Sequence, residues 1–235
     1  SGTPWYSAVS KTAIIIDDQE QLIIRMRDPL TNFEQTEVLQ LDDLPERPPK
    51  TTKLLIETSF QSETSCRIRI TDIGFGEIFA ATGKVWEEQF DITEAAAVPL
   101  QAGKESVIEA TMPLEVFPLD MKMSGTRLFS LEELCWYLSK NVYVTTYDLF
   151  DEKMFFWMDK ITGNHSLALA IANYKSSGKP LKEIVRLLLN AVDYLDNGEI
   201  ARIYNKLTEM ENQNPLEQMR LAADNYNRYG HYMAA

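Results

Sequence analysis

The sequence predicts an α+β protein of two domains, an N-terminal antiparallel β-sandwich and a C-terminal α-helical bundle or repeat-like domain. Short segments that alternate apolar and polar residues, separated by turn residues, fill the first part of the chain. From Ser130 onward the apolar residues recur every three or four positions, which is the helical period. We therefore assign residues 1–92 to the sandwich, 93–125 to a linker with some strand character, and 126–235 to the helical domain.

The expected strands are short, and Asp17–Gln19 is expected to form the turn between the first two. The last of them, CRIRIT, alternates strictly, which is typical of a strand with one buried face. Successive short strands with turns between them favour an antiparallel sandwich. The five segments are Ala13–Ile16, Leu22–Met26, Val38–Leu41, Lys53–Phe60 and Cys66–Thr71.

A proline-rich corner, LPERPP, joins the third and fourth of these strands. Pro45, Pro48 and Pro49 fix the backbone φ angle and have no amide donor, so the corner is stiff and cannot continue a sheet ladder on its donor side. Leu44 can anchor the corner to a core. Taken alone, the pattern indicates a rigid crossover between two sheets without a further function.

The linker and the helical domain follow. Pro113 and Pro118 interrupt the strand character of the linker. Ser130 and Glu133 form the capping box SLEE, in which each side chain can satisfy a backbone amide at the start of a helix. Glycines, prolines and an Asn-Gly pair separate the later helical stripes, so we expect antiparallel neighbours in a bundle or solenoid. The stripes span Leu131–Leu138, Phe150–Ile161, Leu167–Tyr174, Leu181–Leu195, Ile200–Met210 and Leu216–Tyr226.

Composition argues against several classes of function. The formal net charge of -12 disfavours nucleic-acid binding, which needs clustered lysine and arginine. No apolar run is long enough to span a membrane, and no secretory signal pattern opens the chain. Cys66 and Cys135 are read as small buried residues in a reducing compartment, so we expect a cytoplasmic protein.

No constellation of residues points to an enzyme. His165 and His231 are isolated from each other and from the cysteines, so we expect neither a metal site nor a cofactor. The carboxylate pairs Asp17-Asp18 and Asp42-Asp43 fall in expected turns, where aspartate bonds to its own backbone. We therefore expect a non-enzymatic protein that binds a protein or peptide partner, in an oligomeric state that the sequence does not define.

The corner and its flanking strands resemble the β-sandwich substrate-binding domain of the DnaK-type (heat-shock-seventy) chaperones. The similarity covers about residues 3–75, with Thr3-Pro4 before the first two strands and CRIRITD after the corner. It implies a sandwich coupled to an actin-like ATPase elsewhere in a parent protein. The chaperone groove is built largely from strands that precede the Thr-Pro segment, so we expect most of the groove either to be missing or to lie upstream of the given sequence. The matching residues are Leu39, Leu41, Asp42, Leu44, Pro45, Pro48, Ile56, Glu57 and Phe60.

Two further resemblances concern the helical half. LFSLEELCWYL, residues 128–138, is similar to segments of uncharacterised Firmicutes proteins. Tyr226, Gly230, Tyr232 and Ala235 are spaced as in the first helix of a tetratricopeptide repeat. A terminal amphipathic helix explains the second pattern as well, and a helical-repeat adaptor is the alternative function.

Eight residues are candidates for contact with a peptide or partner. Peptide contact on the sandwich would come from Ile14, Ile16, Ile24 or Met26, by strand addition or in an apolar pocket. The segment MFFWM is wider than one apolar helix face needs, so its helix is either central and covered all round or leaves a patch for a partner. GFGEIF is either a glycine-bounded loop that exposes its two aromatic residues or a segment that folds them over the end of the sandwich. Those aromatic candidates are Phe75, Phe79, Phe155 and Phe156.

Overall fold

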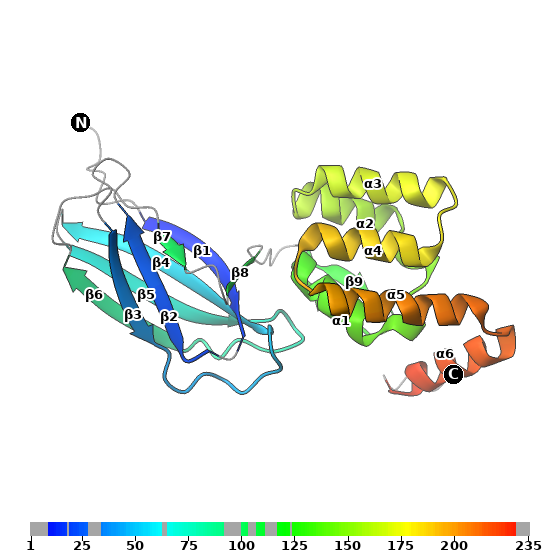
Figure 1. Ribbon diagram of the computed structural model, residues 1–235, viewed down its shortest axis with the longest axis horizontal. Coiled ribbons are helices and arrows are strands. Elements are labelled where there is room, and N and C mark those ends of the chain that lie inside the picture. Colours follow the sequence, from blue (N-terminus) through cyan, green and yellow to red (C-terminus); the bar gives the residue numbers. More distant parts are fainter. Residues whose placement is uncertain are drawn as a thin grey trace. The chain divides into compact units, whose positions relative to one another are not determined.

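The computed structural model divides the chain into two compact units, Ser1–Met112 and Pro113–Ala235 (Figure 1). The first unit is built of antiparallel strands and the second is mainly helical, so the predicted α+β class is confirmed. The structure describes residues 9–17, 19–27, 34–62, 65–91, 100–102, 107–110, 117–122 and 124–228.

The described strands of the first unit form two sheets. One sheet has five strands in the order β6-β5-β4-β1-β8, and the other has three in the order β3-β2-β7. Neighbouring strands in both sheets pair antiparallel. The strands are β1 (Val9–Ile16), β2 (Gln21–Arg27), β3 (Glu34–Gln40), β4 (Thr52–Ser62), β5 (Ser65–Gly74), β6 (Val85–Asp91), β7 (Leu100–Ala102) and β8 (Val107–Ala110).

The two sheets share one hydrophobic core, which makes the unit a sandwich (Figure 1). In β5 the alternate residues Cys66, Ile68 and Ile70 point into it, as the period of two requires. Leu41, at the end of β3, is fully buried, and Leu44 of the corner packs against the cluster. The cluster contains Ile14, Ile16, Leu22, Ile24, Leu39, Leu41, Leu54, Ile56, Cys66, Ile68, Ile70, Trp86 and Phe90.

Residues 93–125, the expected linker, contain β7, β8 and a third described strand, Leu119–Met121, which belongs to the second unit. β7 pairs with β2, and β8 pairs with β1, so both extend the sandwich sheets. Apolar and polar residues are mixed in these short strands without a clear alternation, which is why the sequence indicates only some strand character there. The boundary between the compact units falls after Met112.

The helical unit begins with a small hairpin and continues with helices that pack in chain order. α4 contacts both α3 and α5, and α1 contacts α4 (Figure 1). Two 3₁₀ turns, Val142–Val144 and Tyr147–Leu149, precede α2, and a π-helical turn, Trp157–Ile161, follows it. The elements are β9 (Leu119–Met121), β10 (Thr126–Leu128), α1 (Leu131–Lys140), α2 (Glu152–Phe156), α3 (His165–Ser176), α4 (Leu181–Val192), α5 (Asn197–Asn212) and α6 (Pro215–Arg228).

Side chains cap these helices. The Glu133 amide donates to the Ser130 hydroxyl at 3.4 Å, as the SLEE motif predicts, and the Glu133 carboxylate accepts from the Phe129 amide at 2.7 Å. A complete capping box opens α5, where Asp196 and Glu199 each accept from the other's backbone amide. These contacts satisfy amides that a helix start otherwise leaves unpaired.

The last helix differs from the others in its exposed apolar face. Leu216 is 78% exposed and Met219 is 70% exposed, although both belong to the apolar stripe of the sequence. On α4, by contrast, Ile184, Val185 and Leu188 are all buried. The apolar stripe of α6 is therefore only partly covered within the described residues.

Candidate functional site

A groove of about 1020 Å³ lies within the helical unit, between the β9 segment and the start of α2. It is lined by β9 and the residues before it, by the two 3₁₀ turns, and by one side of α2 with its π-helical turn. Apolar side chains dominate the lining, and charged side chains also border it. The lining comprises Phe117–Lys122, Tyr137, Val144–Thr146, Asp148–Leu149, Asp151–Lys153, Phe156–Trp157 and Ile161.

The start of α2 is fixed by a side-chain cap. Asp151 adopts an extended backbone and accepts a hydrogen bond from the Met154 amide at 3.0 Å, which is the geometry of an N-cap. Met154 is fully buried, so this short helix is anchored to the core on one side. Its other side is left to line the groove.

A π-helical turn continues α2 from Trp157 to Ile161. The Thr162 amide donates to the Trp157 carbonyl at 3.0 Å, which is the five-residue step of a π-helix. Consecutive helical residues point about 100° apart, and the two neighbouring aromatic residues differ in exposure accordingly: Trp157 is 3% exposed, while Phe156 is 60% exposed. π-Helical turns of this kind occur frequently at functional sites.

The indole of Trp157 carries a buried donor without an acceptor. Its Nε1–H is inaccessible to solvent, and no acceptor lies within hydrogen-bonding distance in the part of the chain that the structure describes. Trp86, in the sandwich, provides the contrast, because its Nε1–H donates to the Asp42 carbonyl at 3.0 Å. A buried N–H without a partner is costly, and because this one has no accessible surface it is not open to a ligand in the groove.

Phe156 also borders a second, smaller hollow of about 220 Å³. Phe155 and the exposed Leu169 line this hollow, and His165 Nδ1 lies 2.9 Å from Asp159 Oδ1 at its edge. Hydrogen bonds from Lys160 and His165 lower the pKa of the Asp159 carboxyl. Phe156 is thus an exposed aromatic ridge between two hollows.

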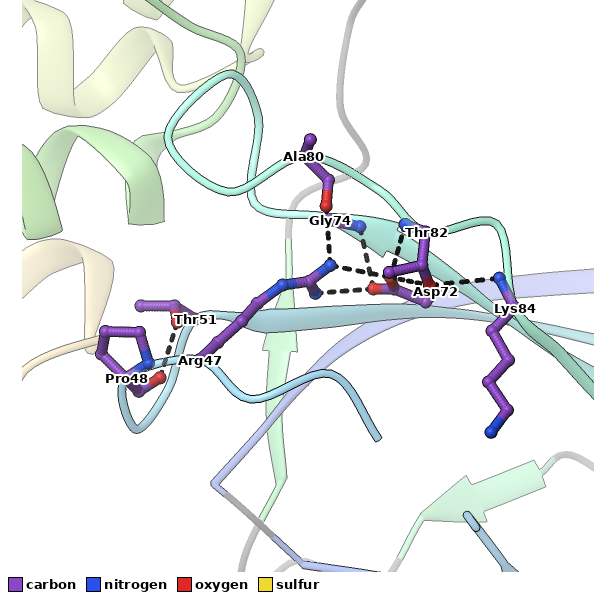
Figure 2. Close-up of polar contacts among 8 residues, drawn as sticks. All are labelled: Arg47, Pro48, Thr51, Asp72, Gly74, Ala80, Thr82 and Lys84. Carbon is purple, nitrogen blue, oxygen red and sulfur yellow. Dashed lines mark hydrogen bonds and ion pairs between the residues drawn. The ribbon is translucent and has the colours of Figure 1, made fainter. Parts of the chain in front are cut away.

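The proline-rich corner is held by a different site, a buried ion pair (Figure 2). Arg47 donates to both carboxylate oxygens of Asp72 at 2.7 and 2.8 Å and to the Ala80 carbonyl at 2.7 Å. Asp72 also accepts from the Gly74 amide, the Thr82 amide and the Thr82 hydroxyl. Burial alone would raise the pKa of Asp72, but these hydrogen bonds outweigh it and lower the pKa.

This network joins three separate segments of the sandwich: the corner, the end of β5 and the loop before β6 (Figure 2). The Thr51 hydroxyl adds a bond to the Pro48 carbonyl at 2.6 Å within the corner. Every oxygen of Asp72 is occupied by donors of the same chain, so the arrangement explains rigidity of the corner. It leaves no open position for a substrate.

The sandwich candidates for peptide contact lie mostly in the core. Ile14, Ile16 and Ile24 are between 1% and 2% exposed and belong to the shared hydrophobic cluster. Contact with a partner through them would require the two sheets to separate. Met26 is in β2, but its side chain lies outside what the structure describes.

The aromatic candidates divide between the two open interpretations. Phe75 is fully buried and Phe79 is half-buried, and their backbones pair across the tight GFGEIF turn. Phe75 therefore offers no side-chain surface to a partner. Phe155 is half-buried and Phe156 is exposed, so the second segment does leave an aromatic surface.

Several groove residues carry no signal in the sequence. Phe117 is 61% exposed and lines the groove from the segment before β9. Asp120, Thr146 and Asp148 lie on a short strand or in irregular turns, where no period indicates their direction. Only the width of the MFFWM apolar run indicated that something unusual surrounds Trp157.

The residues that the structure describes contain neither a metal-ligand cluster nor a membrane-spanning helix. No group of three or more histidine, cysteine, aspartate or glutamate residues is arranged there to hold a metal ion. Among the same residues, every helix is too short or too polar to cross a bilayer.

Comparison with known proteins gives one match. Residues 1–92, which contain most of the sandwich, match a family described as Domain of unknown function (DUF8552). No curated protein and no solved structure matches the chain. The matched region ends at residue 92, as does the sandwich assigned from the sequence, and it gives no support to the chaperone resemblance.

Proposed function

We propose that the helical unit is a non-enzymatic binding module whose groove accommodates an apolar segment of a protein partner. The groove supports this proposal, because an apolar lining with an exposed aromatic rim is typical of peptide-binding surfaces. The exposed aromatic side chains of Phe117 and Phe156 are the observation that carries it, since they offer apolar surface of the groove to a bound side chain.

A binding role fits the groove better than proton-transfer catalysis. General acid–base chemistry needs a nucleophile or base held by a second group at hydrogen-bonding distance. Asp151, the most enclosed carboxylate at the start of α2, is committed to its helix cap. The threonines and carboxylates along the groove instead resemble the polar rim that surrounds an apolar binding surface.

Selection from a displayed library of random peptides tests the proposal. The full chain should enrich peptides with large apolar residues, and Phe156→Asp should abolish their binding, because it places a charge on the exposed aromatic rim. Phe156 is 60% exposed, so the variant should fold normally by circular dichroism. Enrichment that is equally strong with Phe156→Asp, or no enrichment with the wild-type chain, would exclude the groove as the binding surface.

A finer hypothesis concerns the sandwich. The resemblance of residues 3–75 to the DnaK-type sandwich favours a chaperone-related scaffold that couples an upstream ATPase to the helical unit. The buried Arg47–Asp72 pair supports a scaffold role, because it makes the corner a rigid element. The hypothesis requires an actin-like ATPase in the parent protein, and sequencing of the complete reading frame tests it.

The exposed face of α6 favours a second candidate, a helical-repeat adaptor. Leu216 and Met219 lie one turn apart on this helix and are both largely exposed, as in a solenoid helix that packs against a following repeat. Met219→Asp separates the two candidates. It should leave peptide selection unchanged if the groove binds the partner, and it should abolish selection if the α6 face does.

A further inference from the structure

The charged side chains around the groove are unevenly distributed in sign. Four carboxylates, those of Asp120, Asp148, Asp151 and Glu152, line it together with two ammonium groups, those of Lys122 and Lys153. None of the four carboxylates takes part in a salt bridge within the described part of the chain. The rim therefore carries a net negative charge that its own residues do not neutralise by pairing.

Helix capping accounts for only part of this charge. Asp151 caps α2, and a carboxylate at Glu152 also interacts favourably with the helix start. Asp148 lies before α2, in a 3₁₀ turn, and Asp120 comes from β9. Stabilisation of the N-terminus of α2 therefore does not explain the presence of either carboxylate. Both are exposed and border the same apolar surface.

The exposed apolar surface of the groove is the second observation. Phe117, from the segment before β9, is 61% exposed, and Phe156, from α2, is 60% exposed, and both line the groove. An anionic segment would be repelled by the surrounding carboxylates. A positively charged segment that carries an apolar side chain complements both the apolar lining and the charged rim.

From this combination we propose that the groove binds a cationic peptide segment, in which a large apolar or aromatic anchor is flanked by lysine or arginine. The anchor contacts the apolar lining beside Phe156, and the flanking cations pair with Asp120, Asp148 and Glu152. This inference rests on the proposed function and adds the charge of the partner to it.

Two displayed libraries test the charge directly. Each presents a random hexapeptide, flanked in one library by lysine pairs and in the other by glutamate pairs. The lysine library should give at least about tenfold more enrichment on the full-length chain, and its binders should weaken as salt is raised to about 0.5 M. Equal enrichment, or preference for the glutamate library, would overturn the inference while leaving the proposed function intact.

A matched pair of variants locates the effect. Asp148→Asn with Glu152→Gln should weaken a selected lysine-flanked peptide by about fivefold, because exposed ion pairs contribute modestly. Glu209→Gln with Asp224→Asn removes the same charge from exposed positions outside the groove lining and should leave binding unchanged. Wild-type affinity in the first variant would contradict the inference. Failure of both libraries to yield any binder would contradict the proposed function as well.

Discussion

Arg47 and Asp72 form a bidentate ion pair whose side chains are 5% and 0% exposed. Both N–H···O distances are below 2.9 Å, and the guanidinium uses a further donor on the Ala80 carbonyl. The pair connects the proline-rich corner to β5, which forms a hairpin with β4, the strand that directly follows the corner. Because a planar guanidinium and a carboxylate match in two hydrogen bonds, the corner can hold only one position against β5.

Removing the Arg47 side chain should destabilise the sandwich strongly. Arg47→Met leaves the Asp72 carboxylate buried without its cation, which we expect to cost about 3 kcal/mol of the free energy of unfolding. Arg67→Met is the matched control, because Arg67 pairs with Glu87 at the surface and should cost less than about 1 kcal/mol. Chemical denaturation of the wild type and the two variants measures these changes in the free energy of unfolding. Equal losses in Arg47→Met and Arg67→Met would show that the buried pair contributes no more to stability than the surface pair.

The same pair predicts how stability responds to acid. The folded pKa of Asp72 is lowered below its ordinary value of about 3.9, so its contribution is present above that pH and is lost as the pH falls through the folded pKa. Asp72→Asn cannot titrate at this position. The stability difference between wild type and Asp72→Asn should therefore shrink between about pH 5 and pH 2. A difference that stays constant over this range would contradict the lowered pKa.

The sandwich could be predicted because its signal is local and repeated. Alternation in CRIRIT places Ile68 and Ile70 in the core, and the structure buries both completely. The prolines predict a stiff corner, but the partner of Arg47 could not be predicted, because Asp72 lies 25 residues further along the chain. Pairing between distant polar residues depends on tertiary geometry that no local period encodes.

The sequence predicts much less of the groove than of the sandwich. Met154, Trp157 and Met158 share a helical stripe and are buried as that stripe predicts. Phe155 and Phe156 fall beside this stripe, so the helical period already separates them from Trp157, whereas no period in the sequence predicts the π-helical turn that follows. Phe117 comes from a segment without periodicity, and only the folded chain brings it to the groove.

Gly74 is expected to tolerate no side chain. Its φ angle is +70°, and a Cβ atom there would lie 2.4 Å from the Ala81 amide nitrogen. Gly83 has φ +68° with open space around it. Gly83→Ala should therefore lower stability only by the cost of holding alanine in the left-handed backbone conformation, about 1–2 kcal/mol. Gly74→Ala should lose at least twice as much stability in the same denaturation experiment. Similar losses in both variants would mean that the loop shifts without penalty.

Cys66 and Cys135 should be unreactive in the folded protein and should report on separate units. Burial raises the pKa of the Cys66 thiol to about 11. The pKa of the Cys135 thiol is raised by two causes, of which burial is the larger and the charge of the nearby Glu132 is the smaller. Neither should react with a thiol reagent at about pH 8 until its unit opens, because the thiolate is the reactive form. In Arg47→Met, labelling of Cys66 followed by mass spectrometry should accelerate and that of Cys135 should not. Rapid labelling of either cysteine in the wild-type chain would contradict this burial.

The two indole donors should differ in their contribution to stability. Replacing Trp157 with β-(3-benzothienyl)alanine keeps the ring shape and removes an N–H that has no acceptor among the described residues and no accessible surface. We expect no loss of stability, since an unpaired buried donor is removed, and no change in affinity for a selected peptide.

The same replacement at Trp86 is the matched control, because that Nε1–H donates to the Asp42 carbonyl. It should lower stability by about 1 kcal/mol, since a hydrogen bond is lost within the sandwich, and leave peptide affinity unchanged. Chemical denaturation of both variants measures the difference. An equal loss of stability in the two variants would show that the Trp157 donor has a partner in solution.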